Sequence, residues 1–333
     1  QQKAIEIKPD LATAHLNLGI IFIDLGKLQE AEISTRKAIQ INPDYLTAYL
    51  NLGCILKDLG RFQEAKILTL KAIEINPDCA EAYSNMGFIL RDLGKLKEGF
   101  NYIFKAIKIA PSKSRNYTSM TRLLSECNLS HIDKDKLKII LNILFKREDV
   151  SHKELFRAFI FLYKNKLITD NFDYSRENVF EKLINDELII EALKKIIFID
   201  MKWERILTRM RTNICAQIAE NKETISYSQL RFVIALAGQC FLNEYVYSLT
   251  KEENKSIDEI INRCQNGELS EGNISILACY LPLYTLIDRI PDLKSISSSD
   301  QNFKELLKFQ LYEPLNEIKL SKSIKKLGSI NDN

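Results

Sequence analysis

The chain has 333 residues, of which 46% are hydrophobic and 27% charged, and its formal net charge at pH 7 is +3. This balance is that of a globular protein, and the length is enough for two domains of ordinary size. A charge so close to neutral produces no long-range field that would attract nucleic acid or an acidic membrane surface. We therefore expect neither a nucleic-acid partner nor a membrane partner.

The seven cysteines are scattered along the chain, and no two of them form a C-x-x-C pair. This pattern indicates neither a disulfide framework nor a zinc site, so a reducing cytoplasm is the expected location. No apolar run reaches the roughly 20 residues that a membrane-spanning helix needs. The sequence therefore predicts a soluble cytoplasmic protein.

The chain begins with a repeat. Prolines stand at 9, 43, 77 and 111, always 34 residues apart, and glycine, asparagine and aspartate positions recur in register between them. The recurring residues are Gly19, Gly53 and Gly87, then Asn17, Asn51 and Asn85, then Asp24, Asp58 and Asp92, and finally Gly26, Gly60 and Gly94. A period of 34 with small residues at fixed places in two helical segments is typical of a solenoid of helix pairs.

The second copy illustrates the expected helix pair. Asp44 is predicted to cap a first helix that ends at Gly60, where glycine suits a left-handed conformation. A second helix is predicted from Phe62 to Ile75, and Pro77 stops it. Stacking of such pairs turns the first helices to the inner wall of a superhelix, which is where this architecture binds extended partners.

The repeated residues resemble the tetratricopeptide repeat (TPR) family. The middle copy reads Tyr49-x-x-Leu52-Gly53-x-x-Leu56, then Ala65, Ala72 and Pro77. The first copy gives His15, Leu18, Gly19, Phe22, Ala31, Ala38 and Pro43, and the third gives Tyr83, Met86, Gly87, Leu90, Gly99, Ala106 and Pro111. The aromatic that is usual in the family's second helix is replaced by Thr35, Thr69 and Ile103.

The resemblance implies an all-α fold, with a TPR α-solenoid over residues 1–111. It consists of a half repeat at 1–11 and full repeats that start at 12, 46 and 80. Because Gln1 replaces a start methionine and the chain opens within a repeat, we expect a fragment with further repeats upstream.

By analogy with the family, the inner wall is expected to hold an extended peptide or protein segment. A side-chain amide has both a donor and an acceptor, so an asparagine ladder can bond the backbone of any peptide. This arrangement resembles the superhelical repeats of O-linked N-acetylglucosamine transferase and, more distantly, the carboxylate-clamp chaperone receptors. The expected groove residues are Asn17, Asn51, Asn85, Leu16, Leu50, Ile20, Lys57, Phe88, Arg91, Asp24, Asp58 and Asp92.

Two interpretations stay open for the recurring polar residues of this wall. The three asparagines either contact a ligand or bond to neighbouring helices and set the pitch of the solenoid. For the three aspartates, a solvated or structural role at the helix end is favoured over ligand contact.

After Pro111 the 34-residue period is lost, and a non-repeating helical domain is expected over residues 112–333. The periodicity predicts helices near residues 116–127, 133–147, 151–166, 176–199, 202–221, 226–249, 251–265, 273–289 and 301–319. Ser151-x-x-Glu154 and Thr250-x-x-Glu253 have the form of capping boxes. Arg205, Arg209 and Arg211, with Trp203 nearby, are interpreted as a solvated helix surface.

A polar cluster around Gln239 and Cys240 lies in an otherwise apolar helix. Hydrogen bonding that orients an interface is favoured there over catalysis, because no histidine is near in sequence to activate the thiol. We therefore predict no catalytic residue, no metal ligand and no cofactor in this chain.

Residues 232–247 and 311–317 raise a second resemblance, to the helical region that precedes the catalytic domain in bacterial TPR–methyltransferase fusions. It implies that a S-adenosylmethionine-dependent methyltransferase domain lies beyond Asn333 and that the repeats recruit its partner. The alternatives are the recruitment part of a glycosyltransferase-like fusion and a stand-alone enzyme whose site the sequence does not reveal. The sequence identifies neither the partner nor the oligomeric state.

Overall fold

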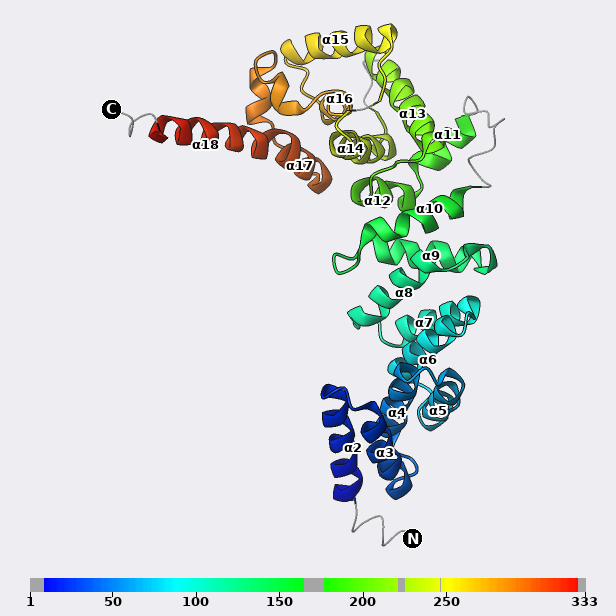
Figure 1. The fold of residues 1–333 in the computed structure, drawn as a ribbon. Coiled ribbons are helices and arrows are strands. Elements are labelled where there is room, and N and C mark those ends of the chain that lie inside the picture. The colour runs from blue at the N-terminus through cyan, green and yellow to red at the C-terminus, as the bar shows by residue number, and fades with distance from the viewer. Residues whose placement is uncertain (1–8, 165–176, 221–224, 246, 329–333) are drawn as a thin grey trace. The chain divides into compact units, whose positions relative to one another are not determined.

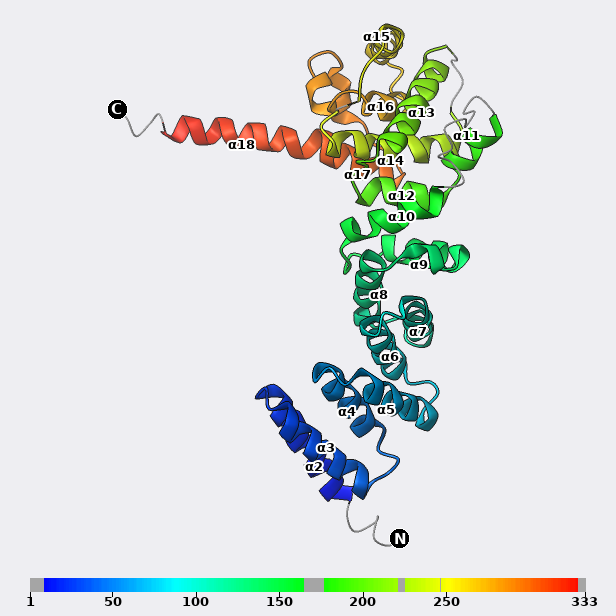
Figure 2. The same cartoon turned by 45° about the vertical axis from the view of Figure 1, so that its right-hand side comes forward.

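The computed structural model describes residues 9–164, 177–220, 225–245 and 247–328. These residues form helices, with no strand among them, in two compact units, Gln1–Ala158 and Phe159–Asn333 (Figure 1, Figure 2). The predicted all-α class, with repeated helix pairs followed by non-repeating helices, is confirmed. The predicted division at residue 112 stays a prediction. The expected half repeat at 1–11 falls mostly outside the described residues.

The first unit opens with three helix pairs, coloured blue to cyan in Figure 1. They are α2 (Pro9–Asp24) with α3 (Leu28–Ile41), α4 (Leu46–Asp58) with α5 (Phe62–Ile75), and α6 (Ala80–Asp92) with α7 (Leu96–Ile109). The unit continues with α8 (Ser114–Glu126), η1 (Leu129–His131), α9 (Lys134–Phe145), η2 (His152–Leu155) and α10 (Phe156–Tyr163), the last of which runs into the second unit. The predicted second helix of the middle repeat has the bounds that the sequence indicated.

Helix α8 keeps the register of the repeats. The helices α4, α6 and α8 begin at residues 46, 80 and 114, and each starts 34 residues after the one before. Ser119 and Thr121 stand where the preceding copy has Asn85 and Gly87. The prediction that the period ends at Pro111 is therefore correct for the residue pattern and wrong for the helix register.

The turn within each pair depends on glycine. Gly60 has a φ of 76°, and Arg61 N donates to Leu56 O at 2.8 Å across the turn. This is the bond pattern of a left-handed helix end, which glycine adopts without a steric penalty. The predicted left-handed stop at Gly60 is confirmed.

The turn between pairs depends on an Asn-Pro sequence. Asn42 precedes Pro43 and is extended, as the proline ring requires of its neighbour. The Asn42 Oδ1 atom accepts a hydrogen bond from Asp44 N at 3.2 Å, so Asp44 is held outside the next helix. Tyr45 is the residue before α4 and makes no side-chain cap. The predicted capping role of Asp44 is therefore wrong.

Gly53 allows α4 and α5 to approach closely. A Cβ atom on Gly53 would lie 2.8 Å from the Thr69 Oγ1 atom, well inside van der Waals contact. The Thr69 hydroxyl is buried and donates to Ala65 O at 2.8 Å. Threonine in place of the family's aromatic thus packs directly against the glycine of the partner helix.

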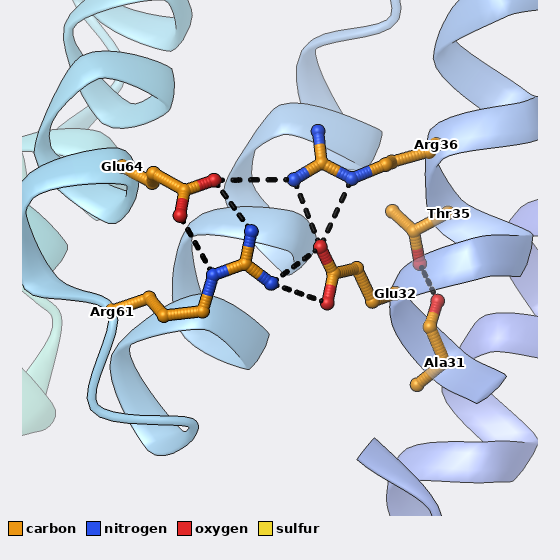
Figure 3. Close-up of polar contacts among 6 residues, drawn as sticks. All are labelled: Ala31, Glu32, Thr35, Arg36, Arg61 and Glu64. Carbon is orange, nitrogen blue, oxygen red and sulfur yellow. Dashed lines mark hydrogen bonds and ion pairs between the residues drawn. The ribbon is translucent and has the colours of Figure 1, made fainter. Parts of the chain in front are cut away.

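An ion-pair network joins the second helices of the first two repeats (Figure 3). Arg61 Nη1 donates to both Glu32 oxygens at 2.8 Å, and Arg61 Nη2 donates to Glu64 at 2.6 Å. Arg36 Nη2 contacts Glu32 at 2.8 Å and Glu64 at 3.5 Å. Hydrogen bonds from Arg61 lower the pKa of Glu64. Because the network is largely exposed, salt screens it.

The second unit is built around α14 (Tyr227–Leu242). Four helices pack on it: α12 (Glu187–Lys195), α13 (Met201–Glu220), α16 (Glu271–Leu277) and α17 (Gln301–Leu307). The unit also contains α11 (Glu177–Ile184), α15 (Lys251–Gln265), η3 (Leu283–Leu286), η4 (Pro291–Ser295), the π-helical η5 (Lys308–Tyr312) and α18 (Glu313–Gly328).

Several predicted helices of this unit are shorter than expected. The helix predicted at 176–199 is divided, because the Asp186 carboxylate accepts from Leu188 N at 3.0 Å and begins α12. The helix predicted at 273–289 ends at Leu277, and Pro282 begins the 3₁₀ turn that follows. Proline lacks the N–H that continued helical bonding requires.

Two further local predictions have opposite outcomes. The Thr250 capping box is confirmed, with Glu253 N donating to the threonine oxygen at 3.1 Å. Ser151 makes no side-chain cap, so the other predicted box is wrong, and a 3₁₀ turn follows it. The helix predicted at 226–249 also stops at Leu242.

Arg211 corrects the prediction of a solvated arginine surface on α13. The side chain of Arg211 is buried, and its Nη2 donates to Glu253 Oε1 at 3.2 Å and to Ser248 O at 3.0 Å. The Tyr280 hydroxyl donates to the same Glu253 oxygen at 2.8 Å. Trp203 is also fully buried. Only Arg205 and Arg209 are exposed as expected.

Candidate functional site

A cleft of about 220 Å³ opens over the first helices of three successive units, α4, α6 and α8. Its lining residues are Gly53, Cys54, Lys57, Asp58, Asn85, Phe88, Ile89, Arg91, Arg115 and Arg122. We call this feature the array cleft. It lies entirely within the first unit.

The array cleft brings together some of the predicted groove residues and not others. Those that line it are Lys57, Asp58, Asn85, Phe88 and Arg91. The other predicted residues do not line it. Asn51 is half-buried, and four are exposed: Asn17, Ile20 and Asp24 on α2, and Asp92. Leu16 and Leu50 expose 4% and 6% of their surface and pack between helices, so they offer little area to a ligand.

Asn85 differs from its two counterparts in the ladder. It is 4% exposed, and its Nδ2 atom has no hydrogen-bond partner within the described part of the chain. A buried donor without a partner costs about 1–3 kcal/mol relative to a satisfied one. Because Asn85 lines the array cleft, an acceptor on a bound molecule would satisfy this amine.

Four cationic side chains and one carboxylate line the array cleft. Lys57 Nζ lies 2.6 Å from Asp58, and Arg122 Nε lies 3.0 Å from Glu126. Arg91 Nη2 lies 2.8 Å from the carboxylate of Asp92, a residue that does not line the cleft. Such partly exposed pairs are weak and can exchange partners.

Arg115 is the least engaged of these cations. Among the described residues, its guanidinium makes no ion pair within 4.0 Å, and its side chain is exposed. An anionic group that enters the array cleft therefore meets a cation with no carboxylate to displace. This arrangement favours acidic ligands.

Cys54 is half-buried in the array cleft. Burial raises the pKa of its thiol, and the charges of Lys57 and Arg115 offset this only in part. Because the thiolate is the reactive form, this cysteine is a weak nucleophile at neutral pH. No group of three His, Cys, Asp or Glu side chains that could hold a metal ion occurs in the described ranges.

Arg115 and Arg122 line the array cleft but are not among the groove residues predicted from the sequence. They stand 34 residues after Glu81 and Phe88, so the register of the repeats extends to them although the consensus residues do not. Continuing the period by one more helix would have identified both residues.

Models of the tetratricopeptide repeat match residues 12–45, 46–79 and 80–113. Residues 12–113 are therefore tetratricopeptide repeats, as their sequence resemblance implied. Arrays of this kind are protein-interaction scaffolds. None of the described helices combines the length and apolar composition that spanning a bilayer requires.

Several solved structures are similar to part of the chain. The Arabidopsis OM64 TPR domain is 21% identical over 35% of this chain and 98% of that chain, with a TM-score of 0.34. The first TPR of Spaghetti (RPAP3), bound to the HSP90 peptide SRMEEVD, is 20% identical over 34% of this chain and 89% of that chain, with a TM-score of 0.33.

A mutant O-GlcNAc transferase of Thermobaculum terrenum is 22% identical over 41% of this chain and 26% of that chain, with a TM-score of 0.37. A comparison with curated proteins finds no match.

Proposed function

We propose that the first unit recruits a protein partner by binding an extended acidic segment of that partner in the array cleft. The observation that carries this proposal is Asn85, whose buried Nδ2 donor lines the cleft without a partner. A backbone carbonyl of the segment accepts from this amine. Acidic side chains of the same segment pair with Arg115 and Arg122.

The charge distribution supports an acidic segment over a neutral one. Four cations line the array cleft against one carboxylate. The pairs that Lys57 and Arg122 make are at the protein surface, so little free energy is lost when they exchange to a ligand carboxylate. Salt should weaken the complex, because each ligand contact of this kind is screened.

The test is calorimetry with an acidic heptapeptide selected from an arrayed library. We expect Asn85→Ala to weaken binding by about 1–3 kcal/mol through the lost hydrogen bond. Asn17→Ala is the matched control, since Asn17 occupies the same repeat position but is exposed outside the cleft. The double variant Asn51→Ala with Asn85→Ala is expected to match the single Asn85 variant. Equal affinity for Asn85→Ala and wild type would exclude the array cleft.

Alkylation of Cys54 gives an independent measure of where the peptide binds. Cys54 lines the array cleft, and Cys79 is also half-buried but lies outside it. A bound peptide should slow the reaction of iodoacetamide with Cys54 and leave that of Cys79 unchanged. Equal protection of both thiols would point to a general stabilisation instead of occupancy of the cleft.

We also propose that the recruited partner is the substrate of an adjoining S-adenosylmethionine-dependent methyltransferase module. Support comes from the resemblance of residues 232–247 and 311–317 to the helical region of TPR–methyltransferase fusions. The coding frame after Asn333 tests this idea: a strand, a glycine-rich turn and a following acidic residue are expected. A frame without them would remove the methyltransferase and leave the scaffold proposal intact.

A further inference from the structure

The second unit contains a larger cleft that the proposed function does not use. It has a volume of about 490 Å³ and lies between the end of α12, one face of α14, and the continuous helix formed by α17 and η5. Small-molecule sites typically have volumes of about 300–1,000 Å³. We call this feature the α14 cleft. Its lining includes Ile234, Ala235, Phe241, Leu306 and Phe309.

Gly238 gives the α14 cleft its depth. It lies in the interior of α14, and a Cβ atom placed on it would meet nothing within 4 Å. Glycine weakens a helix interior, and here neither a close helix contact nor a positive φ requires it. Any larger residue at this position would project into the cleft. The glycine is thus explained by the open space that it leaves.

The π-helical turn η5 forms the opposite wall. Pro314 has no N–H to bond Gln310 O, four residues earlier, and this accounts for the widened helix just before it. The Gln310 amide donates to Ala237 O at 2.9 Å and accepts from the Tyr245 hydroxyl at 3.1 Å, which fixes the turn to α14. Phe309 is left 51% exposed at the mouth of the cleft.

The residues that line the α14 cleft include three lysines, Lys194, Lys195 and Lys308, and one acidic residue, Glu305. Lys194 Nζ lies 3.0 Å from Glu191 and 3.0 Å from Asn302 Oδ1. Lys308 Nζ lies 3.6 Å from Glu313 in an exposed pair, which contributes little and exchanges readily. Lys194 therefore has one of its three donors left for a ligand, and Lys308 can exchange its partner for a ligand carboxylate.

We propose that the α14 cleft binds a small amphipathic carboxylate. Its apolar body lies over Gly238 between the rings of Phe241 and Phe309, and its carboxylate pairs with Lys194 and Lys308. The apolar lining provides binding area, and the lysines select the charge and orientation of the ligand.

Dodecanoate is the probe, and dodecanol is its neutral counterpart. Calorimetry on the full chain, below the concentration at which the probe forms micelles, should detect one saturable site for dodecanoate. The Lys194→Ala, Lys308→Ala double variant should lower dodecanoate affinity by about tenfold or more, since two charged hydrogen bonds are lost. The weaker binding of dodecanol should not change in this variant.

Gly238→Leu tests the location of the site. A Cβ at this position meets nothing within 4 Å, and leucine is a better helix former than glycine, so the variant should fold normally while losing binding of both probes. Lys255→Ala, on the exposed surface of α15, is the control for nonspecific attraction and should bind dodecanoate like the wild type. Three results would overturn the proposal: no saturable binding of dodecanoate, equal affinity for dodecanol, or unchanged binding in both cleft variants.

Discussion

The close approach of α4 and α5 allows us to predict how much Gly53→Ala changes the free energy of unfolding. The new Cβ would lie 2.8 Å from Thr69 Oγ1, whereas ordinary contact begins at 3.4 Å, so the helices or the threonine must shift by about 0.6 Å. Thr69 is a short, β-branched side chain that is 1% exposed and bonded to Ala65 O, so it has little freedom to move. Overpacking of this kind costs about 1–3 kcal/mol.

The helix propensity of alanine offsets about 1 kcal/mol of that cost. We therefore expect Gly53→Ala to lower the free energy of unfolding by up to about 2 kcal/mol. Gly238→Ala is the matched control, because its Cβ meets nothing within 4 Å. It should raise stability by about 0.5–1 kcal/mol. Urea denaturation followed by circular dichroism measures both changes.

The double variant Gly53→Ala with Thr69→Ala separates the clash from other effects. Removing the threonine oxygen removes the contact, so the two changes together should cost less than the sum of the single changes by about 1 kcal/mol or more. A Gly53→Ala variant that gains stability as Gly238→Ala does, or strict additivity of the two substitutions, would contradict the predicted clash.

Two charge-dependent predictions follow from ion pairs in the two units. Glu253→Gln should destabilise the protein by about 3–5 kcal/mol, because it leaves the buried charge of Arg211 without a counter-charge. Burial opposes ionisation of Glu253, but hydrogen bonds, led by that from Thr250 N, and the Arg211 charge give its carboxyl a lowered pKa. The stabilising contribution of Glu253 is therefore present above its ordinary pKa and is lost as the pH falls through the lowered pKa. The difference in free energy of unfolding between variant and wild type, measured by urea denaturation, should shrink as the pH is lowered. Arg61→Ala removes the pairs with Glu32. Its effect on the melting temperature should shrink as the NaCl concentration is raised to about 1 M, because salt screens exposed charges. An effect that does not depend on salt would mean that the variant loses packing and not charge.

The sequence by itself determined the repeat array, because the signals that define it are local. Gly60 and Pro77 act on the chain within a few residues of where they stand, so the helix from Phe62 to Ile75 could be predicted to the residue. The local signal at Asp44 was misjudged. Asp44 has the right residue type for a cap, but α4 begins at Leu46 and the residue before it is Tyr45, so Asp44 lies one position too early.

Only the tertiary structure decided which of several equivalent residues are buried. Asn17 and Asn85 occupy the same repeat position. Asn17 is exposed, whereas Asn85 is buried, with 4% of its surface exposed, and lines the array cleft. Arg209 and Arg211 lie two positions apart on α13, and Arg211 is buried because Glu253 and Tyr280, far along the chain, close over it. Burial depends on helices that meet only in three dimensions, and the pattern of one helix does not contain that information.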